Sequence, residues 1–311
     1  MVEAIICGPT AAGKSKIAFE LAKANGFEII SADSRQIYKG LEIGTAQVSQ
    51  KEQEEVPHHF MGFLLPSEPY SVNRFRDDVM LLLKNNPEKR FIIAGGTGLY
   101  IRALLYQQKQ KRQEVPDSIK QIVHEMILNK GAGEVHKELA QKDPQVALKI
   151  HPNDKFRIAK AMENLLTTGN SYQFYDYSDD THELFQKTKI FVINQSRECL
   201  YKKINERTLS MIEQGWVEEV KTLLKAPNAE DLPCLNALGY KQIVPYVQKQ
   251  CDLEIIVKKV QQLTRNFAKK QITFFKSQLK NGEFIDFERF LKIGNKNCWK
   301  WTETLDGLRD S

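Results

Sequence analysis

The chain has 311 residues, 41% of them hydrophobic, which is enough to bury a substantial core in one large domain or two smaller ones. No stretch approaches the ~20 apolar residues that a membrane span needs and no signal peptide is recognisable, so we expect a cytoplasmic protein. The five cysteines lack the CxxC spacing of zinc knuckles, and a net charge of +6 permits a nucleic-acid partner without requiring one.

A phosphate-binding loop is predicted near the N-terminus. The octet Gly8-Pro9-Thr10-Ala11-Ala12-Gly13-Lys14-Ser15 follows an apolar run at 2–7 and opens a helical pattern at 16–24. Backbone N–H groups of such a loop and the helix N-terminus converge on an anion. We expect Lys14 to reach the terminal phosphates and the Ser15 hydroxyl to hold Mg²⁺. The alternative is a chance glycine turn, and the motif does not distinguish a nucleoside triphosphate from another diphosphate.

Two further apolar runs end in residues suited to a site. The run 27–33 ends in Asp33, and the run that begins at Phe91 passes through glycines to Thr97. Because parallel strands deliver their carboxyl ends to one crevice, we expect both side chains to face the phosphate loop. Asp33 is a candidate Mg²⁺ ligand or general base, and the alternative is that it caps the following turn. Residues 34–46 are predicted to form a loop that lines the site.

The chain changes character between about residues 107 and 180, where helical patterns occur with no strand between them. We therefore predict an α/β fold with a parallel sheet core and a helical insertion. The expected division is 1–106 for the first part of the core, 107–180 for the insertion, 181–283 for the continuation of the core, and 284–311 for a C-terminal tail.

A strand pattern resumes at 189–194, and a long helix follows from Arg197 to Met211. This helix carries Arg197, Lys203 and Arg207 at spacings that place them on one side. We expect Arg207 to point at the phosphates.

A cationic helix face is predicted between Lys258 and Lys280, where seven basic residues occur without one Asp or Glu. On a helical projection the basic residues and the apolar residues separate onto opposite faces. The basic stripe is Lys258, Arg265, Lys269, Lys276 and Lys280, and the apolar stripe is Ile256, Val260, Leu263, Phe267 and Phe274. Without acidic partners at helical spacing, this face favours a polyanion over a merely solvated surface.

Several segments, in this order, resemble the bacterial tRNA dimethylallyltransferases of the tRNA isopentenyltransferase family over about residues 3–280. They are GPTAAGKS, ADSRQIYKGLEIGTA, PHHF, YSVNRFRDD, GGTGLYIRALL, HPNDKFRIAKAME, ALGYKQI and TRNFAKKQITFF. The resemblance implies a P-loop, kinase-like α/β core with a helical insertion that clasps the anticodon stem-loop of tRNA.

The implied reaction transfers a dimethylallyl group from dimethylallyl diphosphate to N6 of the adenosine just 3′ of the anticodon, in tRNAs that read codons beginning with U. The expected partners are therefore dimethylallyl diphosphate and the tRNA anticodon stem-loop, with Mg²⁺ as cofactor and no membrane. We expect the protein to act as a monomer.

The resemblance also implies residue roles. Asp33 would be the general base, Thr97 would contact the bridging oxygen of the donor, and Lys14 and Arg207 would neutralise the leaving group. The residues expected to bind the diphosphate are Gly8, Pro9, Thr10, Ala11, Ala12, Gly13, Lys14, Ser15 and Arg207, and Ser15 would hold the metal. Those expected to contact tRNA are Asp33, Ser34, Arg35, Gln36, Thr97, Asn153, Arg157, Lys160, Lys241, Arg265, Lys269 and Lys270.

The chain departs from the family pattern at several of these places. The family commonly has arginine where this chain has Lys160, Lys241 and Lys270, and tryptophan where it has Phe274. Lysine keeps the charge but lacks the bidentate fork of arginine, so the RNA contacts there are expected to differ. An aspartate is also usual where Gly62 stands.

Three other functions are compatible with parts of the sequence. A small-molecule P-loop kinase would use the same loop for ATP and Asp33 to activate a hydroxyl. A noncatalytic RNA-binding protein would keep the cationic helix face but not the transfer reaction. A prenyltransferase acting on free adenine nucleotides would share the core but not need the insertion.

Overall fold

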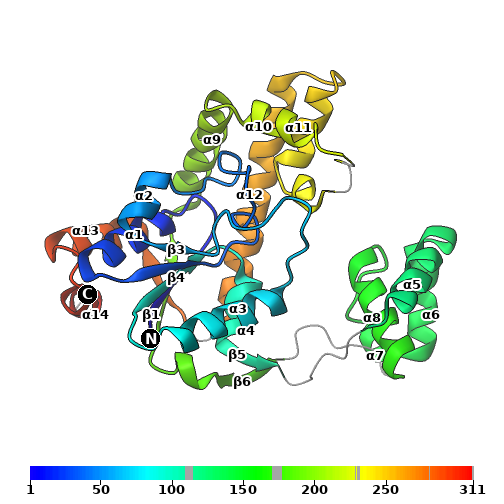
Figure 1. Ribbon diagram of the computed structural model, residues 1–311, viewed down its shortest axis with the longest axis horizontal. Helices are drawn as coiled ribbons and strands as arrows, with labels where there is room; N and C mark the ends of the chain where they lie inside the picture. Colours follow the sequence, from blue (N-terminus) through cyan, green and yellow to red (C-terminus); the bar gives the residue numbers. More distant parts are fainter. Residues whose placement is uncertain (109–114, 170–176, 228, 230–231, 280, 310–311) are drawn as a thin grey trace. The chain divides into compact units, whose positions relative to one another are not determined.

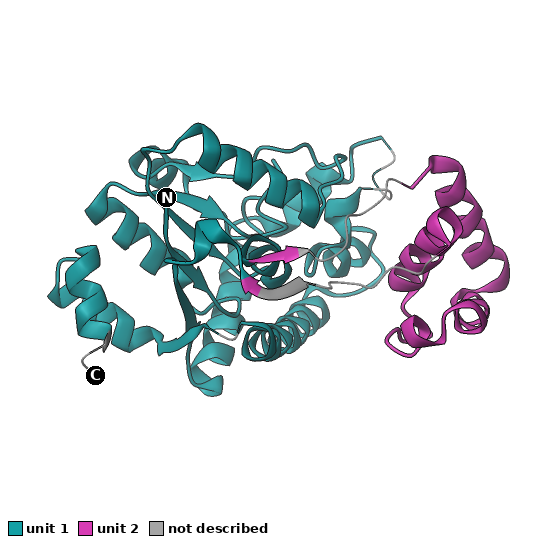
Figure 2. Cartoon of the chain, turned by 90° about the horizontal axis from the view of Figure 1, so that it is seen from below, with its two compact units in different colours: residues 1–105, 181–311 teal, residues 106–180 magenta. Residues whose placement is uncertain are grey.

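The computed structural model describes residues 1–108, 115–169, 177–227, 229, 232–279 and 281–309 (Figure 1). They form two compact units, shown in different colours in Figure 2. Unit 1 comprises residues 1–105 and 181–311, and unit 2 comprises residues 106–180. The insertion was expected at 107–180, so its first residue differs by one from that of unit 2.

Unit 1 is built on a six-stranded sheet in which every pair of neighbours is parallel. The strand order is β3 (His58–His59), β2 (Glu28–Ser31), β4 (Phe91–Gly95), β1 (Val2–Cys7), β7 (Lys189–Asn194) and β8 (Glu283–Asp286). The central strands are near-continuous apolar runs because both faces of a parallel sheet are covered. The predicted parallel α/β core is thereby confirmed.

Helices surround this sheet (Figure 1). Helix α1 (Lys14–Asn25) follows β1 and ends at Gly26, whose left-handed φ of 66° caps the helix without the penalty that a Cβ would bring. The other helices of unit 1 are α2 (Gln50–Glu55), α3 (Val72–Asn85), α4 (Gly98–Leu105), α9 (Arg197–Glu213), α10 (Trp216–Leu223), α11 (Tyr240–Val247), α12 (Leu253–Gln278), α13 (Phe287–Lys296) and α14 (Trp301–Arg309). None of the helices in the described residues is both long and apolar enough to cross a bilayer.

Helix α12 packs through a different stripe from the predicted one. Its buried residues are Ile256, Val260, Thr264, Ala268, Gln271 and Phe275. The prediction was right for the first two but wrong for Phe267, whose side chain is 46% exposed. A stripe that advances mostly by four residues drifts around the helix, and a single straight projection over 26 residues misses that drift.

The described residues after Asn281 contribute to the core, so the expected separation of 284–311 as a tail is corrected. Strand β8 pairs with β7, and α13 and α14 then bury Phe290, Trp299 and Trp301 in the same cluster as β1 and α1. The rings of Phe290 and Phe191 meet edge to face, with centroids 5.4 Å apart. Strand β8 is a short edge strand with only Ile285 buried, which is why its sequence carries so little strand signal.

Unit 2 has its own core, formed by α5 (Asp117–Lys130), α6 (Ala132–Lys142), α7 (Pro144–Ala147) and α8 (Lys155–Thr168). Its buried side chains include Val123, Val135, Leu139, Ile158 and Met162. Two short strands, β5 (Tyr106–Gln108) and β6 (Tyr177–Thr181), pair with each other. The sequence did not reveal this strand pair, which lies at the two ends of the segment, whereas the described residues 115–169 between them contain helices and no strand, as expected.

Replacing Phe290 with alanine should lower the free energy of unfolding by about 3–5 kcal/mol, because a fully buried ring leaves a cavity. Chemical denaturation measures the loss. Phe284→Ala is the matched control, since Phe284 lies on β8 with its side chain 39% exposed, and it should lose less than half as much. Equal losses would show that the C-terminal segment is not part of the core.

Candidate functional site

The octet Gly8 to Ser15 connects the buried strand β1 to helix α1, which is the context that a phosphate loop requires. Gly8 and Gly13 have φ of 143° and 89°. A Cβ at Gly8 would overlap the carbonyl oxygen of Ile193, and one at Gly13 would overlap the ring of Phe287. Both positions therefore need glycine for conformation and for space.

Two cations lie at this loop. Lys14 Nζ donates to the Pro9 carbonyl at 2.7 Å, and Arg207 Nη2 donates to Thr10 Oγ1. Burial lowers the pKa of Lys14 to about 8, while Asp33 raises it and Arg207 lowers it further. Burial also lowers the pKa of Arg207, and the charge of Asp33 opposes that shift. Asp33 is thus close enough to affect the pKa of both cations.

Asp33 and Thr97 follow neighbouring strands, as expected, because β2 pairs with β4. The Oδ1 of Asp33 accepts hydrogen bonds from the backbone N–H groups of Arg35 at 2.9 Å and Gln36 at 3.4 Å, so the side chain does cap the following turn. Its Oδ2 makes no hydrogen bond with the residues that the structure describes. Thr97 Oγ1 accepts from the N–H of Ser34 at 3.0 Å. Capping and a role in a site are therefore compatible for Asp33.

A cavity of about 510 Å³ brings most of the predicted site residues together. Its lining includes Thr10, Ala11, Gly13, Lys14, Ser15, Asp33, Ser34, Arg35, Gln36, Thr97 and Arg207, all from unit 1. Gly8, Pro9 and Ala12 are buried residues of the loop and do not line the cavity. Apolar side chains complete the lining, among them Met211, Trp216, Leu238, Val260 and Phe267. One cavity therefore offers anion-binding groups, a carboxylate and apolar surface.

Gln271 is a site residue that the sequence reasoning missed. Its Oε1 accepts from the Thr10 N–H at 2.8 Å, and its Nε2 donates to the Gly96 carbonyl at 2.8 Å. The side chain is 7% exposed, so the amide ties α12 to both the phosphate loop and the end of β4. Its signal in the sequence is a long polar residue in the buried row of an otherwise small or apolar helix face.

Glu219 is a second site residue that the sequence reasoning missed, and it has no recognisable sequence signal. Its carboxylate accepts from the N–H groups of Ile43 at 2.8 Å and Gly44 at 3.0 Å, and from the Tyr240 hydroxyl at 2.7 Å. Burial raises the pKa of this carboxyl, and the hydrogen bonds oppose that shift. These contacts hold the loop that carries Gly44, Thr45 and Ala46 against the cavity.

The predicted cationic face of α12 is present in part. Arg265 and Lys269 each lie 5.8 Å from the ring centroid of Tyr201 on α9, and Arg265 also donates to Asn205 Oδ1. Lys270 and Lys276 are exposed, as is Lys241 on α11. Lys258 is paired with Glu254 at 2.7 Å, so the first residue of the predicted basic stripe does have an acidic partner at helical spacing. Lys280 lies outside the described residues.

The remaining predicted RNA-binding residues belong to unit 2 and lie at the beginning of α8. Asp154 caps this helix by accepting from the N–H of Arg157 at 3.0 Å, and it also pairs with the Arg157 guanidinium at 3.1 Å. Lys160 Nζ lies 2.6 Å from Glu163 Oε2. Asn153 is exposed, and its N–H donates to His151 Nδ1 at 3.2 Å.

Comparison with known proteins decides the family. A model described as IPP transferase matches residues 36–278, and one described as isopentenyl transferase matches residues 1–64. The chain belongs to the IPP transferase family. A relative from Exiguobacterium named tRNA dimethylallyltransferase is 36% identical over 304 residues, or 95% of this chain and 94% of the relative. The resemblance drawn from the sequence is confirmed.

Solved structures of this family share the fold. The tRNA delta(2)-isopentenylpyrophosphate transferase from Staphylococcus epidermidis is 35% identical, with a TM-score of 0.64 over 93% of this chain and 94% of that protein. The full-length tRNA isopentenylpyrophosphate transferase from Bacillus halodurans is 28% identical, with a TM-score of 0.67 over 99% and 98% of the two chains.

The lowered pKa of Lys14 predicts pH-dependent binding of inorganic pyrophosphate. Below about 8 the ammonium is charged and ready to pair with the anion. Above that value binding must first add a proton, so the affinity should fall by up to about tenfold per pH unit. Calorimetric titration between neutral pH and mildly alkaline pH checks this.

The matched control is Lys14→Arg, because a guanidinium stays charged throughout this range. Its affinity, whatever its absolute value, should not show the fall that the unchanged chain shows. If both chains lose affinity equally with pH, a group other than Lys14 is responsible.

Proposed function

We propose that this chain transfers a dimethylallyl group from dimethylallyl diphosphate to N6 of the adenosine just 3′ of the anticodon, in tRNAs that read codons beginning with U. The observation that carries the proposal is the cavity in which Lys14 and Arg207 of an anion-binding site meet the carboxylate of Asp33. Membership of the IPP transferase family supports prenyl transfer, and relatives named tRNA dimethylallyltransferase support tRNA as the acceptor.

The donor's diphosphate belongs at the phosphate loop. A loop of this kind and the start of the helix that follows it can bind an anion through backbone N–H groups. Lys14 and Arg207, which line the cavity, add two positive charges. When the bond between the prenyl carbon and the bridging oxygen breaks, negative charge grows on the leaving diphosphate. Cations that are already in place stabilise that charge without further reorganisation.

The acceptor adenine belongs beside Asp33. The unused Oδ2 of this carboxylate can accept a hydrogen bond from the N6 amine, while Oδ1 holds the turn that fixes the side chain. As N6 forms its bond to the prenyl carbon, its proton passes to Asp33 and diphosphate departs. The hydroxyl of Thr97, anchored by the Ser34 N–H, is placed in the same cavity to contact the bridging oxygen.

The site also suits Mg²⁺, because hard cations prefer oxygen ligands and commonly keep water and phosphate oxygens in their shell. Ser15 lies in the first turn of α1, lines the cavity and is exposed to it, so its hydroxyl would hold the ion. When bound, Mg²⁺ would neutralise part of the charge on the leaving diphosphate.

The target adenine of the tRNA would have to leave the base stack to enter the cavity, as it does in other enzymes that modify bases. Asp33, Ser34, Arg35 and Gln36 form one turn at the cavity and would meet this nucleotide. Phosphates of the stem-loop would be bound by the basic side chains of α12, by Lys241 and by the start of α8. We expect the enzyme to act as a monomer in the cytoplasm.

The deciding experiment offers labelled dimethylallyl diphosphate to an anticodon stem-loop, to AMP and to a stem-loop that lacks the target adenosine, with ATP as competitor. Label is expected in the first acceptor only. Label in AMP alone would identify a prenyltransferase of free nucleotides, and ATP consumption without label would identify a kinase. In the same assay Asp33→Asn should abolish transfer while binding of the stem-loop remains within a few fold, because the amide cannot accept the proton.

Replacing Lys269 with alanine should weaken stem-loop binding and reduce the slope of log affinity against log salt by about one, if its ammonium neutralises an RNA phosphate. Filter binding over a salt series measures the slope. Lys258→Ala is the control on the same helix, because Glu254 already pairs with that ammonium, and its slope should not change. An unchanged slope for Lys269→Ala would mean that this face of α12 is only solvated.

A further inference from the structure

Lys203 lies on α9 one helical turn before Arg207, and it lines the same cavity as Thr10 and Lys14. The reaction as derived above does not use it. Its side chain is 34% exposed, so the ammonium is reachable from the cavity and from solvent.

The C-terminal segment holds this ammonium close to the phosphate loop. Lys203 Nζ stands 4.4 Å from the ring centroid of Phe287, and that ring packs so closely on Gly13 that no Cβ fits between them. The same ring therefore contacts both the loop and the ammonium, which keeps the two within the width of one aromatic side chain of each other. The cation is therefore directed to the end of the cavity where α1 begins.

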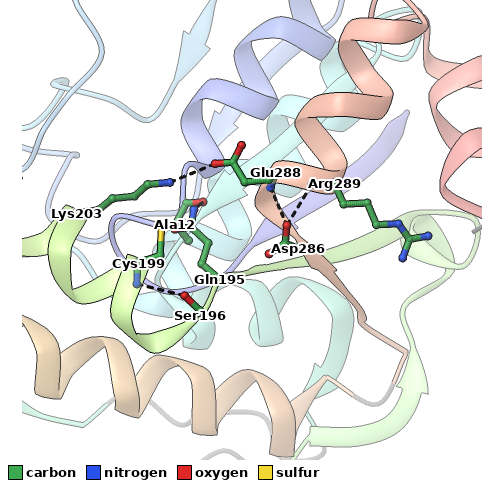
Figure 3. Close-up of polar contacts among 8 residues, drawn as sticks. All are labelled: Ala12, Gln195, Ser196, Cys199, Lys203, Asp286, Glu288 and Arg289. Carbon is green, nitrogen blue, oxygen red and sulfur yellow. Dashed lines mark hydrogen bonds and ion pairs between the residues drawn. The ribbon is translucent and has the colours of Figure 1, made fainter.

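Both elements that carry this contact are anchored. At the start of α9, Gln195 Nε2 donates to the Ala12 carbonyl at 3.0 Å, and the Ser196 hydroxyl accepts from the Cys199 N–H at 3.2 Å (Figure 3). At the start of α13, Asp286 Oδ1 accepts from the N–H groups of Glu288 at 3.0 Å and Arg289 at 3.1 Å. The backbones of the two helices that carry Lys203 and Phe287 are thus held by hydrogen bonds at their starts.

The carboxylate of Glu288 does not satisfy Lys203. The two side chains face each other (Figure 3). Their charges are 3.8 Å apart, longer than a hydrogen bond, and the Glu288 side chain is 70% exposed. Exposed pairs of this kind contribute little, because water and salt screen them. A multiply charged diphosphate in the cavity would compete easily with one solvated carboxylate for this ammonium.

We propose that Lys203 is a third cationic ligand of the diphosphate, placed by Phe287 and working beside Lys14 and Arg207. The proposal rests on the proposed function, which puts the donor diphosphate in this cavity. It also gives the C-terminal segment a part in the site, since Phe287 and Glu288 both belong to α13. Diphosphate in the cavity would draw Lys203 away from Glu288 and onto a phosphate oxygen.

The test is calorimetric titration of the full chain with inorganic pyrophosphate, the minimal probe of the site. Lys203→Gln should bind about tenfold more weakly, the loss expected for one charge-assisted contact. Lys203→Arg, which keeps the charge, should bind within a few fold of the unchanged chain. Lys202→Gln is the matched control, because Lys202 is the neighbouring residue with its side chain 78% exposed and does not line the cavity.

A further variant separates binding from support of the fold. If Lys203 serves the diphosphate, Glu288→Gln should bind pyrophosphate as tightly as the unchanged chain or slightly more tightly, since it removes a competing charge. If instead Lys203 and Glu288 only join two helices, Lys203→Gln and Glu288→Gln should each lose pyrophosphate affinity and thermal stability together. That result would overturn the proposal.

Failure of this inference is distinguishable from failure of the proposed function. Equal pyrophosphate affinity for the unchanged chain and Lys203→Gln, with prenyl transfer intact in both, would remove Lys203 from the site and leave the function standing. Absence of both pyrophosphate binding and prenyl transfer in the unchanged chain would overturn both.

Discussion

The amide of Gln271 holds the phosphate loop in a shape that the loop alone would not keep. It accepts a hydrogen bond from the Thr10 N–H and donates one to the Gly96 carbonyl. Each bond therefore holds a backbone group that borders the cavity. A glycine-containing loop has many accessible conformations, and fixing one costs entropy that distant contacts must offset. Gln195 at the end of β7 and Phe287 at the start of α13 provide the remaining support. The proposed anion site therefore depends on elements from both ends of the chain.

This support concentrates positive charge around a single carboxylate. Lys14 and Arg207 are buried enough for their pKa values to fall, and Asp33 opposes both shifts. Two cations and one carboxylate leave a net positive charge in the cavity. This charge favours binding of a diphosphate whatever organic group the diphosphate carries. The apolar side chains of the same cavity, such as Met211 and Trp216, suit a ligand that joins a diphosphate to a hydrocarbon.

The C-terminal segment shows how a stretch without a motif can be structurally important. Its edge strand exposes Phe284 and buries only Ile285, and its tryptophans follow no regular period. Local sequence cannot reveal that Phe287 reaches Gly13, because the two residues are brought together only by the pairing of β7 with β8. The same limitation explains the misplaced apolar face of α12, since the direction in which a long helix packs changes along its length.

Local patterns were enough to predict the parallel α/β core, the strand–loop–helix context of Gly8 to Ser15, and the positions of Asp33 and Thr97 after adjacent strands. These features depend on local periodicity and on the rule that parallel strands end at one edge of the sheet. The sequence also determined the family, through motifs that extend along most of the chain. The contacts of Gln271 and Glu219 at the site, the position of Phe267 at the cavity and the approach of α13 to the phosphate loop became visible in the folded structure alone. Those contacts join residues far apart in the chain, and their geometry is set by packing that no local pattern encodes.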